Sequence, residues 1–128
     1  MRARLAAFAA PLAILLASGA AKAAEEINFT VDTAGDLAVL CATSTEHPLY
    51  ASAIHMCHGY LIGLHHFHQA YAAATDEAFY CVPQSGDVPS RNDVSAAFAA
   101  WVVSTDGVAE QEALDAVLTW ASTNYPCQ

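Results

Sequence analysis

Basic side chains are the scarcest feature of this 128-residue sequence, which has four Lys and Arg against 13 Asp and Glu. Three of the four lie in the first 23 residues, so Arg91 is the only Lys or Arg of residues 24–128. One arginine against 13 carboxylates gives this part a formal charge of −12 with neutral histidines. The balance argues against a nucleic-acid partner and an anionic membrane surface, because a single arginine cannot replace the counterions of many phosphates. It permits a cationic protein partner.

The sequence also has no apolar run long enough for a transmembrane span. Arg2 and Arg4 precede an apolar stretch over residues 5–17, and Ala21-Lys22-Ala23 has the form of a signal-peptide cleavage site. A spanning helix needs about 20 apolar residues, and Pro11 interrupts this stretch. We therefore predict a cleaved signal peptide over residues 1–23, in preference to an N-terminal anchor. A single domain over residues 24–128 would then be periplasmic or secreted, with no membrane contact after cleavage.

Recognisable catalytic motifs are missing as well. None of the serines lies in a G-x-S-x-G setting, and no glycine-rich phosphate loop is present. The length leaves room for one domain only. We therefore predict a protein that is not an enzyme and needs no cofactor.

Helical periodicity accounts for most of the mature chain, and hardly any segment has the pattern of a strand. Residues 33–36 and 90–93 resemble helix N-caps, and Pro48 suits the first turn of a long helix. We predict an all-α fold of four helices, over about 34–43, 48–74, from Ser90 to a tight turn at 104–107, and 109–123. The apolar faces predicted for them comprise Leu37, Leu40 and Cys41; Ile54, Cys57, Leu61, Leu64, Phe67, His68 and Tyr71; Val94, Ala97, Phe98, Trp101 and Val102; and Ala113, Leu114, Val117, Leu118 and Ala121.

All four cysteines follow the predicted leader, and in an oxidising compartment an even number predicts two disulfides. Three connectivities are possible. Cys41 lies near the end of the first predicted helix and Cys57 about two and a half turns into the second, whereas Cys81 precedes the third and Cys127 follows the fourth. If each pair of helices is antiparallel, Cys41 lies near Cys57 and Cys81 lies near Cys127, so we favour these two bridges.

Six histidines lie within 22 residues, from His47 to His68. The pairs His55/His58 and His65/His68 have the i,i+3 spacing that could hold a metal ion. The two pairs are about 10 Å apart along a helix, however, so one ion could not bind all four. We favour a helix face whose polar positions are histidines, with His68 bonded within the fold, over a pH-responsive surface or a metal site.

A set of short motifs resembles the Rap/Tai family of type VI secretion immunity proteins. The motifs are Leu37 to Cys41, Cys57-His58-Gly59-Tyr60-Leu61-Ile62-Gly63, Cys81-Val82-Pro83, Pro89-Ser90-Arg91 and Pro126-Cys127. The resemblance implies an exported helical domain, often a homodimer, that binds a peptidoglycan amidase from a rival cell and occludes its active site. Inhibitory contacts in the family come from protruding loops, which makes Asp76, Glu77, Asp87 and Asp106 the candidate partner-binding residues here.

A second hypothesis belongs to a different class. The carboxylates and histidines could serve a periplasmic acid-stress or chaperone-like protein, because protonation of all six histidines would halve the charge from −12 to −6.

Overall fold

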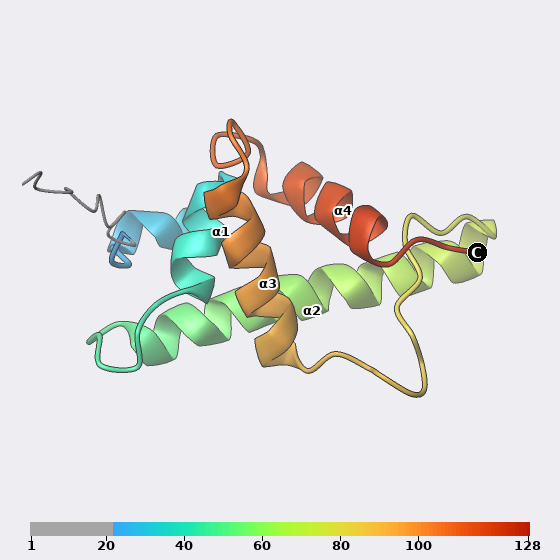
Figure 1. Cartoon of the computed structure of the whole chain (residues 1–128), viewed down its shortest axis with the longest axis horizontal. Coiled ribbons are helices and arrows are strands. Elements are labelled where there is room, and N and C mark those ends of the chain that lie inside the picture. Colours follow the sequence, from blue (N-terminus) through green and yellow to red (C-terminus); the bar gives the residue numbers. More distant parts are fainter. Residues whose placement is uncertain (1–21) are drawn as a thin grey trace, which may run out of the picture.

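Figure 1 shows the computed structural model, which describes residues 22–128. These residues form a short 3-10 helix, η1 (Glu26–Thr30), and the helices α1 (Ala34–Cys41), α2 (Tyr50–Thr75), α3 (Arg91–Ser104) and α4 (Ala113–Asn124). The described part has no strand, and Thr33 and Glu112 form an isolated bridge. The predicted all-α fold of four helices is therefore confirmed. The predicted leader over residues 1–23 lies outside the described residues, apart from its last two.

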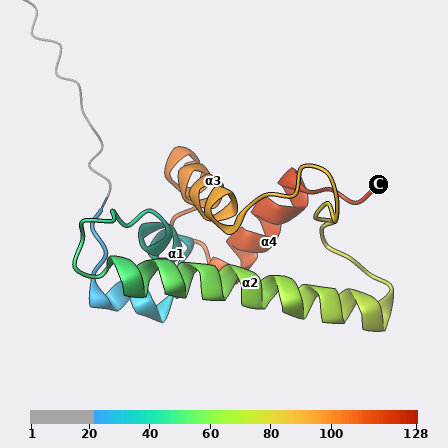
Figure 2. The ribbon, with the colours of Figure 1, turned by 90° about the horizontal axis from the view of Figure 1, so that it is seen from below.

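The shortest of the four helices, α1, is at the centre of the core. It contacts η1 and each of the other three helices, and the side chains of Leu37 and Leu40 are fully buried. Cys57 of α2, Phe98 of α3 and Ala116 of α4 belong to the same buried cluster. Figure 2 shows α1, α3 and α4 on one side of the long helix α2. Burial of these apolar side chains is the main stabilising term of a domain this small.

Two helices begin with the local hydrogen bonds that their sequences predict. Thr33 Oγ1 accepts a 3.2 Å bond from the Asp36 N–H, and the Asp36 carboxylate accepts bonds from the Thr33 N–H and hydroxyl at 3.0 and 2.8 Å. Ser90 and Asp93 form the same reciprocal arrangement at the start of α3. Such capping boxes pair backbone donors that a helix leaves unsatisfied at its N-terminus.

The last helix begins at Ala113, four residues after the predicted start at 109. The carbonyl oxygens of Ala109 and Gln111 accept bonds of 2.9 and 2.8 Å from the N–H groups of Gly35 and Ala34. Residues 109–111 thus supply acceptors for the first N–H groups of α1, and they do so outside a helix. The tertiary bonds prevail over the local helical pattern, so the predicted boundary was wrong.

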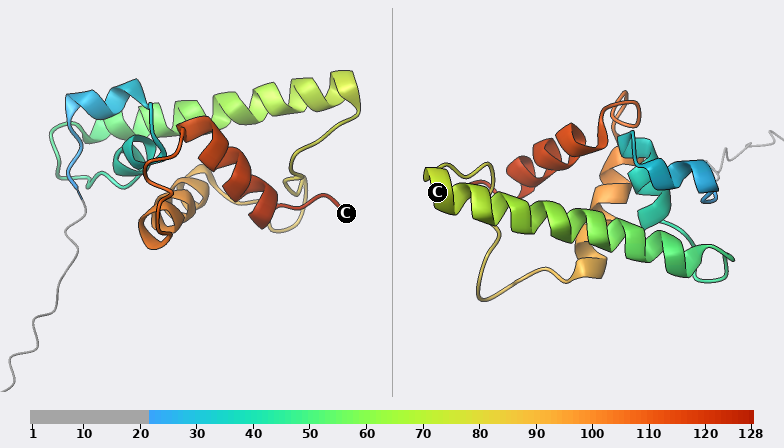
Figure 3. Two further views of the ribbon diagram at one scale, coloured as in Figure 1. Left: turned by 90° about the horizontal axis from the view of Figure 1, so that it is seen from above. Right: turned by 180° about the vertical axis from the view of Figure 1, so that it is seen from behind.

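The long helix α2 has 26 residues, about 39 Å at 1.5 Å per residue, and only one side of it is covered. Figure 3 shows it from two further directions, with its C-terminal half extending past the other helices. Phe67 is 66% exposed, contrary to prediction, because it lies one position, about 100°, away from the buried His68. The predicted burial of Leu114 and Ala97 is also wrong: both are exposed, because each points away from the side of its helix that meets α1.

Two disulfides close the domain. Cys41 is joined to Cys57 and Cys81 to Cys127, which is the pairing that the helix geometry favours from the sequence. The first bridge ties α1 to α2 inside the core. The second ties the loop after α2 to the C-terminal tail, where the Cys81 N–H also donates a 2.7 Å bond to the Tyr125 carbonyl.

None of the helices in residues 22–128 combines the length and the apolar character needed to cross a membrane.

Candidate binding site

The four acidic residues predicted to bind a partner are all exposed, but they are not equally available. Asp76 ends α2 in the left-handed conformation, with φ 59°. The Glu77 carboxylate accepts a 3.3 Å bond from the Tyr71 hydroxyl. Within residues 22–128, the carboxylates of Asp76, Asp87 and Asp106 take part in no hydrogen bond of this kind, so these three are more available for a partner than Glu77.

Asp87 and Asp106 lie beyond opposite ends of α3. Asp87 belongs to the loop over residues 77–90 that leads into α3, and Asp106 to the turn that follows it. The 14 residues of α3 span about 21 Å. The structure therefore does not bring the predicted binding residues together at one place, and a single partner would need a wide interface to contact both loops.

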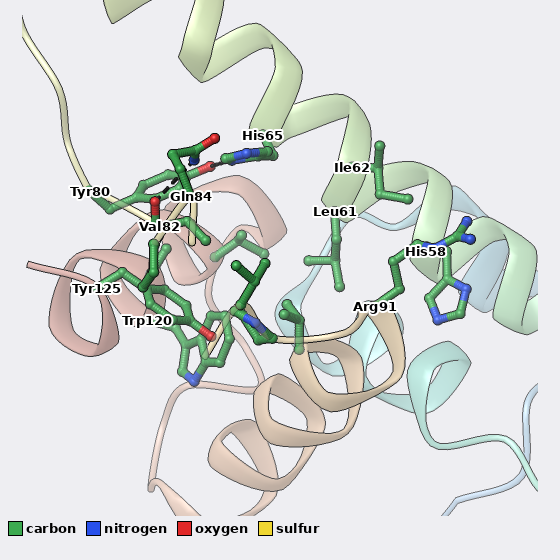
Figure 4. A pocket seen from close by; sticks show the side chains of 16 residues that line it. His58, Leu61, Ile62, His65, Tyr80, Val82, Gln84, Arg91, Trp120 and Tyr125 are labelled. Atoms are coloured by element: carbon green, nitrogen blue, oxygen red, sulfur yellow. Dashed lines mark hydrogen bonds between the residues drawn. The ribbon is translucent and has the colours of Figure 1, made fainter. Parts of the chain in front are cut away.

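A cleft of about 320 Å³ lies where the loop 77–90 faces α2, α3 and α4. Figure 4 shows its lining side chains, with His58 and Arg91 at one end and His65, Tyr80 and Gln84 at the other. Most of the lining is apolar or aromatic, and the complete set consists of His58, Leu61, Ile62, His65, Tyr80, Val82, Pro83, Gln84, Val88, Pro89, Arg91, Val94, Val117, Trp120, Ala121 and Tyr125. From the sequence, most of these residues are predicted to lie in the core or in a loop, and no sequence pattern indicates that they line one cleft.

The histidines do not form one continuous surface. His55 and His66 are exposed, whereas His58 and His65 are half-buried beside the cleft and His68 is 5% exposed. No three side chains of His, Cys, Asp or Glu in residues 22–128 are placed to hold a metal ion. The histidine spacing therefore does not produce a metal site in this part of the chain.

His68 instead belongs to an aromatic cluster that holds the start of the loop against α2. Its Nε2 accepts a 3.0 Å bond from the Phe79 N–H, and its ring stacks on Tyr80 with centroids 4.0 Å apart. Tyr80 also contacts His65, whose Nδ1 lies 3.3 Å from the Tyr80 hydroxyl. These contacts fix the Tyr80 side of the cleft.

Burial controls the ionisation of the groups around this cleft. Desolvation by burial lowers the pKa of His68. The pKa values of His58 and His65 are lowered in the same way by burial, and to a smaller extent by repulsion from neighbouring basic groups. For His58, Arg91 contributes to the shift. Burial raises the pKa of Tyr80. The histidines around the cleft are therefore neutral near pH 7 and act there as hydrogen-bonding groups without a charge.

Residues 22–128 thus form a small all-helical domain, closed by two disulfides, with exposed acidic loops and an apolar cleft. The model of the Rap1a immunity proteins matches residues 33–127. The chain belongs to this family, which confirms the resemblance seen in its sequence motifs. No curated protein and no solved structure matches the chain.

Proposed function

We propose that this protein is a type VI secretion immunity protein that binds a peptidoglycan amidase delivered by a rival cell and occludes its active site. The observation that carries the proposal is the family match, which spans residues 33–127 and so includes α1 to α4 and both disulfides. Rap1a immunity proteins are non-enzymatic binders of effectors. The protein would act by occupying a surface of the effector, without chemistry of its own.

The charge of the protein supports a cationic partner. Its exposed loops present the carboxylates of Asp87 and Asp106, and the mature chain would have a formal charge of −12. Complementary charge speeds the encounter with a basic active-site cleft and orients it. The two loops lie about 21 Å apart along α3, so one of them could enter the cleft while the other contacts its rim.

The proposed location is the periplasm, where an amidase that cuts peptidoglycan would act. Removal of the leader at residues 1–23 would release the domain over 24–128, and two disulfides suit an oxidising compartment. The two disulfides, one in the core and one at the C-terminal tail, would stabilise this domain, whose hydrophobic core is modest.

A protection assay tests the proposal. The gene next to this one should encode an amidase, and expression of the chain should protect cells in which that amidase is sent to the periplasm. Charge reversal by Asp87→Lys or Asp106→Lys should reduce protection, whereas Glu46→Lys, an exposed loop carboxylate between α1 and α2, should not. Full protection by both loop variants would remove these loops from the interface, and no protection by the native chain would overturn the proposal.

A homodimer is part of the same proposal, because α2 has an uncovered face suited to close contact. Phe67 is 66% and Met56 37% exposed, and no atom other than those of the local helix backbone lies within 4 Å of the Cβ position at Gly59 or Gly63. Light scattering on the mature chain should give twice the monomer mass, and Gly63→Gln should return it to the monomer. A monomeric native chain at micromolar concentration would contradict the dimer without affecting the immunity assay.

A further inference from the structure

The cleft between α2, α4 and the loop 77–90 has the character of a small-molecule site. Its walls combine aliphatic side chains from the helices with Val88 of the loop and the ring of Trp120. Its volume of about 320 Å³ falls at the lower end of the range, about 300–1,000 Å³, in which small ligands bind. Figure 4 shows Arg91 and His58 at one end of the cleft and His65, Tyr80 and Gln84 at the other, and the wall between them adds only the indole N–H of Trp120 and the hydroxyl of Tyr125 to its apolar side chains. Such a lining suits a ligand with an apolar body and a polar end.

Arg91 and His58 form one end of the cleft, and their charge determines whether the polar end of a ligand there is an anion or a cation. Arg91 is the only arginine of the described residues, in a part of the chain that holds 13 carboxylates. Its side chain is exposed at the cleft beside His58, and no carboxylate of residues 22–128 forms an ion pair with it. Burial, together with Arg91 and His55, lowers the pKa of His58, so Arg91 is the cation at this end of the cleft. The cleft therefore offers one cation for one anionic group.

A guanidinium pairs best with a planar anion that accepts two parallel hydrogen bonds, as a carboxylate does. The net charge of the chain repels highly charged anions such as nucleotides at long range, and a singly charged ligand is repelled least. If each non-hydrogen atom of a ligand, with its hydrogens, occupies about 30 Å³, about ten such atoms would fill the cleft. This number corresponds to an aliphatic or aromatic carboxylate of about eight carbon atoms.

We propose that this cleft binds a small amphipathic carboxylate, with the apolar body between Leu61, Val88 and Trp120 and the carboxylate on Arg91. The cleft shares the loop 77–90 with Asp87, which is proposed to contact the effector, whereas Arg91 belongs to α3 and to neither acidic loop. The proposed site would also explain the place of the single arginine, which pairs with no carboxylate of the described chain.

Titration of the disulfide-bonded mature chain with octanoate tests the site. Trp120 lines the cleft and is 4% exposed, so binding should change the tryptophan emission as well as produce heat in calorimetry. We expect saturation with a dissociation constant below about 1 mM. Octanol, which has the same body without the charge, should bind about tenfold more weakly, and acetate should not bind measurably. Absence of saturation by octanoate up to about 10 mM would overturn the proposal.

Variants separate the two parts of the site. Arg91→Gln should weaken octanoate binding about tenfold and leave octanol binding unchanged. Val88→Asp should abolish both, whereas Val103→Asp, at a residue of α3 that is 82% exposed and outside the cleft, should change neither. Octanoate binding by Arg91→Gln as tight as that of the native chain would overturn the assignment of the carboxylate. Arg91→Gln should still protect cells from the effector, so failure of this proposal and failure of the immunity proposal are distinguishable.

Discussion

The backbone N–H of Phe79 donates a 3.0 Å hydrogen bond to Nε2 of His68, a side chain that is 5% exposed. Because Nε2 accepts this bond, the neutral ring must carry its proton on Nδ1, which is buried without a partner in the described chain. A doubly protonated ring would direct a second N–H at the Phe79 N–H. Only the neutral form of His68 can therefore accept this bond, which helps to hold the start of the loop 77–90 against α2.

This arrangement predicts a loss of stability in mild acid. Burial lowers the pKa of His68 in the folded protein below its usual value of 6.5, so the unfolded chain binds the proton more readily. The contribution of His68 is therefore complete above pH 6.5 and is lost as the pH falls toward the folded pKa. The facing groups are His65 of α2, whose pKa burial also lowers, and Tyr80 of the loop, which is neutral throughout this range.

Urea unfolding between pH 7.5 and 5 measures this effect. The free energy of unfolding should fall over this range, and the fall should be smaller in His68→Gln, whose amide oxygen can still accept the bond from Phe79. His55→Gln, at an exposed position of the same helix, serves as the control and should behave like the native chain. An identical pH dependence in His68→Gln and the native chain would show that His68 does not hold the loop in this way.

The helix starts that could be predicted from the sequence are those fixed by neighbours in the chain. Thr33 with Asp36, and Ser90 with Asp93, form their capping boxes within four residues, so the pattern alone indicates them. The start of α4 could not be predicted, because residues 109–111 bond to α1, more than 70 residues earlier in the chain. The short helix η1 was missed for a related reason: Asn28, besides its local cap on Glu25, donates a bond to Asp36 of α1.

The bond between residues 109–111 and α1 makes Gly35 the least replaceable glycine of the helices. A Cβ at Gly35 would lie 3.0 Å from the Ala109 carbonyl oxygen, which belongs to the backbone and accepts the Gly35 N–H bond. Gly35→Ala should therefore destabilise the fold by about 1 kcal/mol or more, although alanine favours helix. Gly59→Ala is the matched control in α2, where nothing outside the helix backbone lies within 4 Å, and in the monomer it should stabilise by about 0.5–1 kcal/mol. Urea unfolding of both variants gives the comparison, and stabilisation by Gly35→Ala would refute the close contact.

For the candidate sites too, features set by neighbouring residues in the sequence could be predicted, and features made by distant residues could not. The loops that contain Asp87 and Asp106 could be predicted because proline and glycine mark them in the sequence. The cleft could not, because Leu61, Val88 and Trp120 come from separate elements and meet only in the folded chain. Three of the histidines considered as metal ligands, His58, His65 and His68, are partly or fully buried in the fold, which helical spacing alone could not show.

The two disulfides should differ in their resistance to reduction. Cys57 is fully buried and Cys41 is 8% exposed, whereas Cys81 and Cys127 are both exposed. Brief treatment of the folded protein with dithiothreitol, followed by alkylation and mass spectrometry, should therefore label Cys81 and Cys127 first. Labelling of Cys41 and Cys57 at the same rate would contradict the burial of that bridge.

Replacing a bridge measures its contribution to stability. The bridges close loops with sequence separations of 16 and 46 residues, which correspond to about 3 and 4 kcal/mol of loop-closure entropy. The double variant Cys81→Ser and Cys127→Ser should thus lose up to about 4 kcal/mol of the free energy of unfolding and should release the tail from the loop. An unchanged midpoint of urea unfolding would show that this bridge does not constrain the unfolded chain.

Phe98 should be the most sensitive aromatic position of the core. Its side chain is fully buried in α3, with the rings of Trp101 and Trp120 centred 6.1 and 5.8 Å away, so truncation would leave a cavity among rigid groups. Phe98→Ala should cost about 3–5 kcal/mol, a large share of the stability of a domain this small. Val103→Ala, five residues along the same helix and 82% exposed, should change stability by less than about 0.5 kcal/mol. Urea unfolding of the two variants measures the difference. A loss below about 1 kcal/mol in Phe98→Ala would mean that the core can close around the missing ring, contrary to the packing of α3 between α1 and α4.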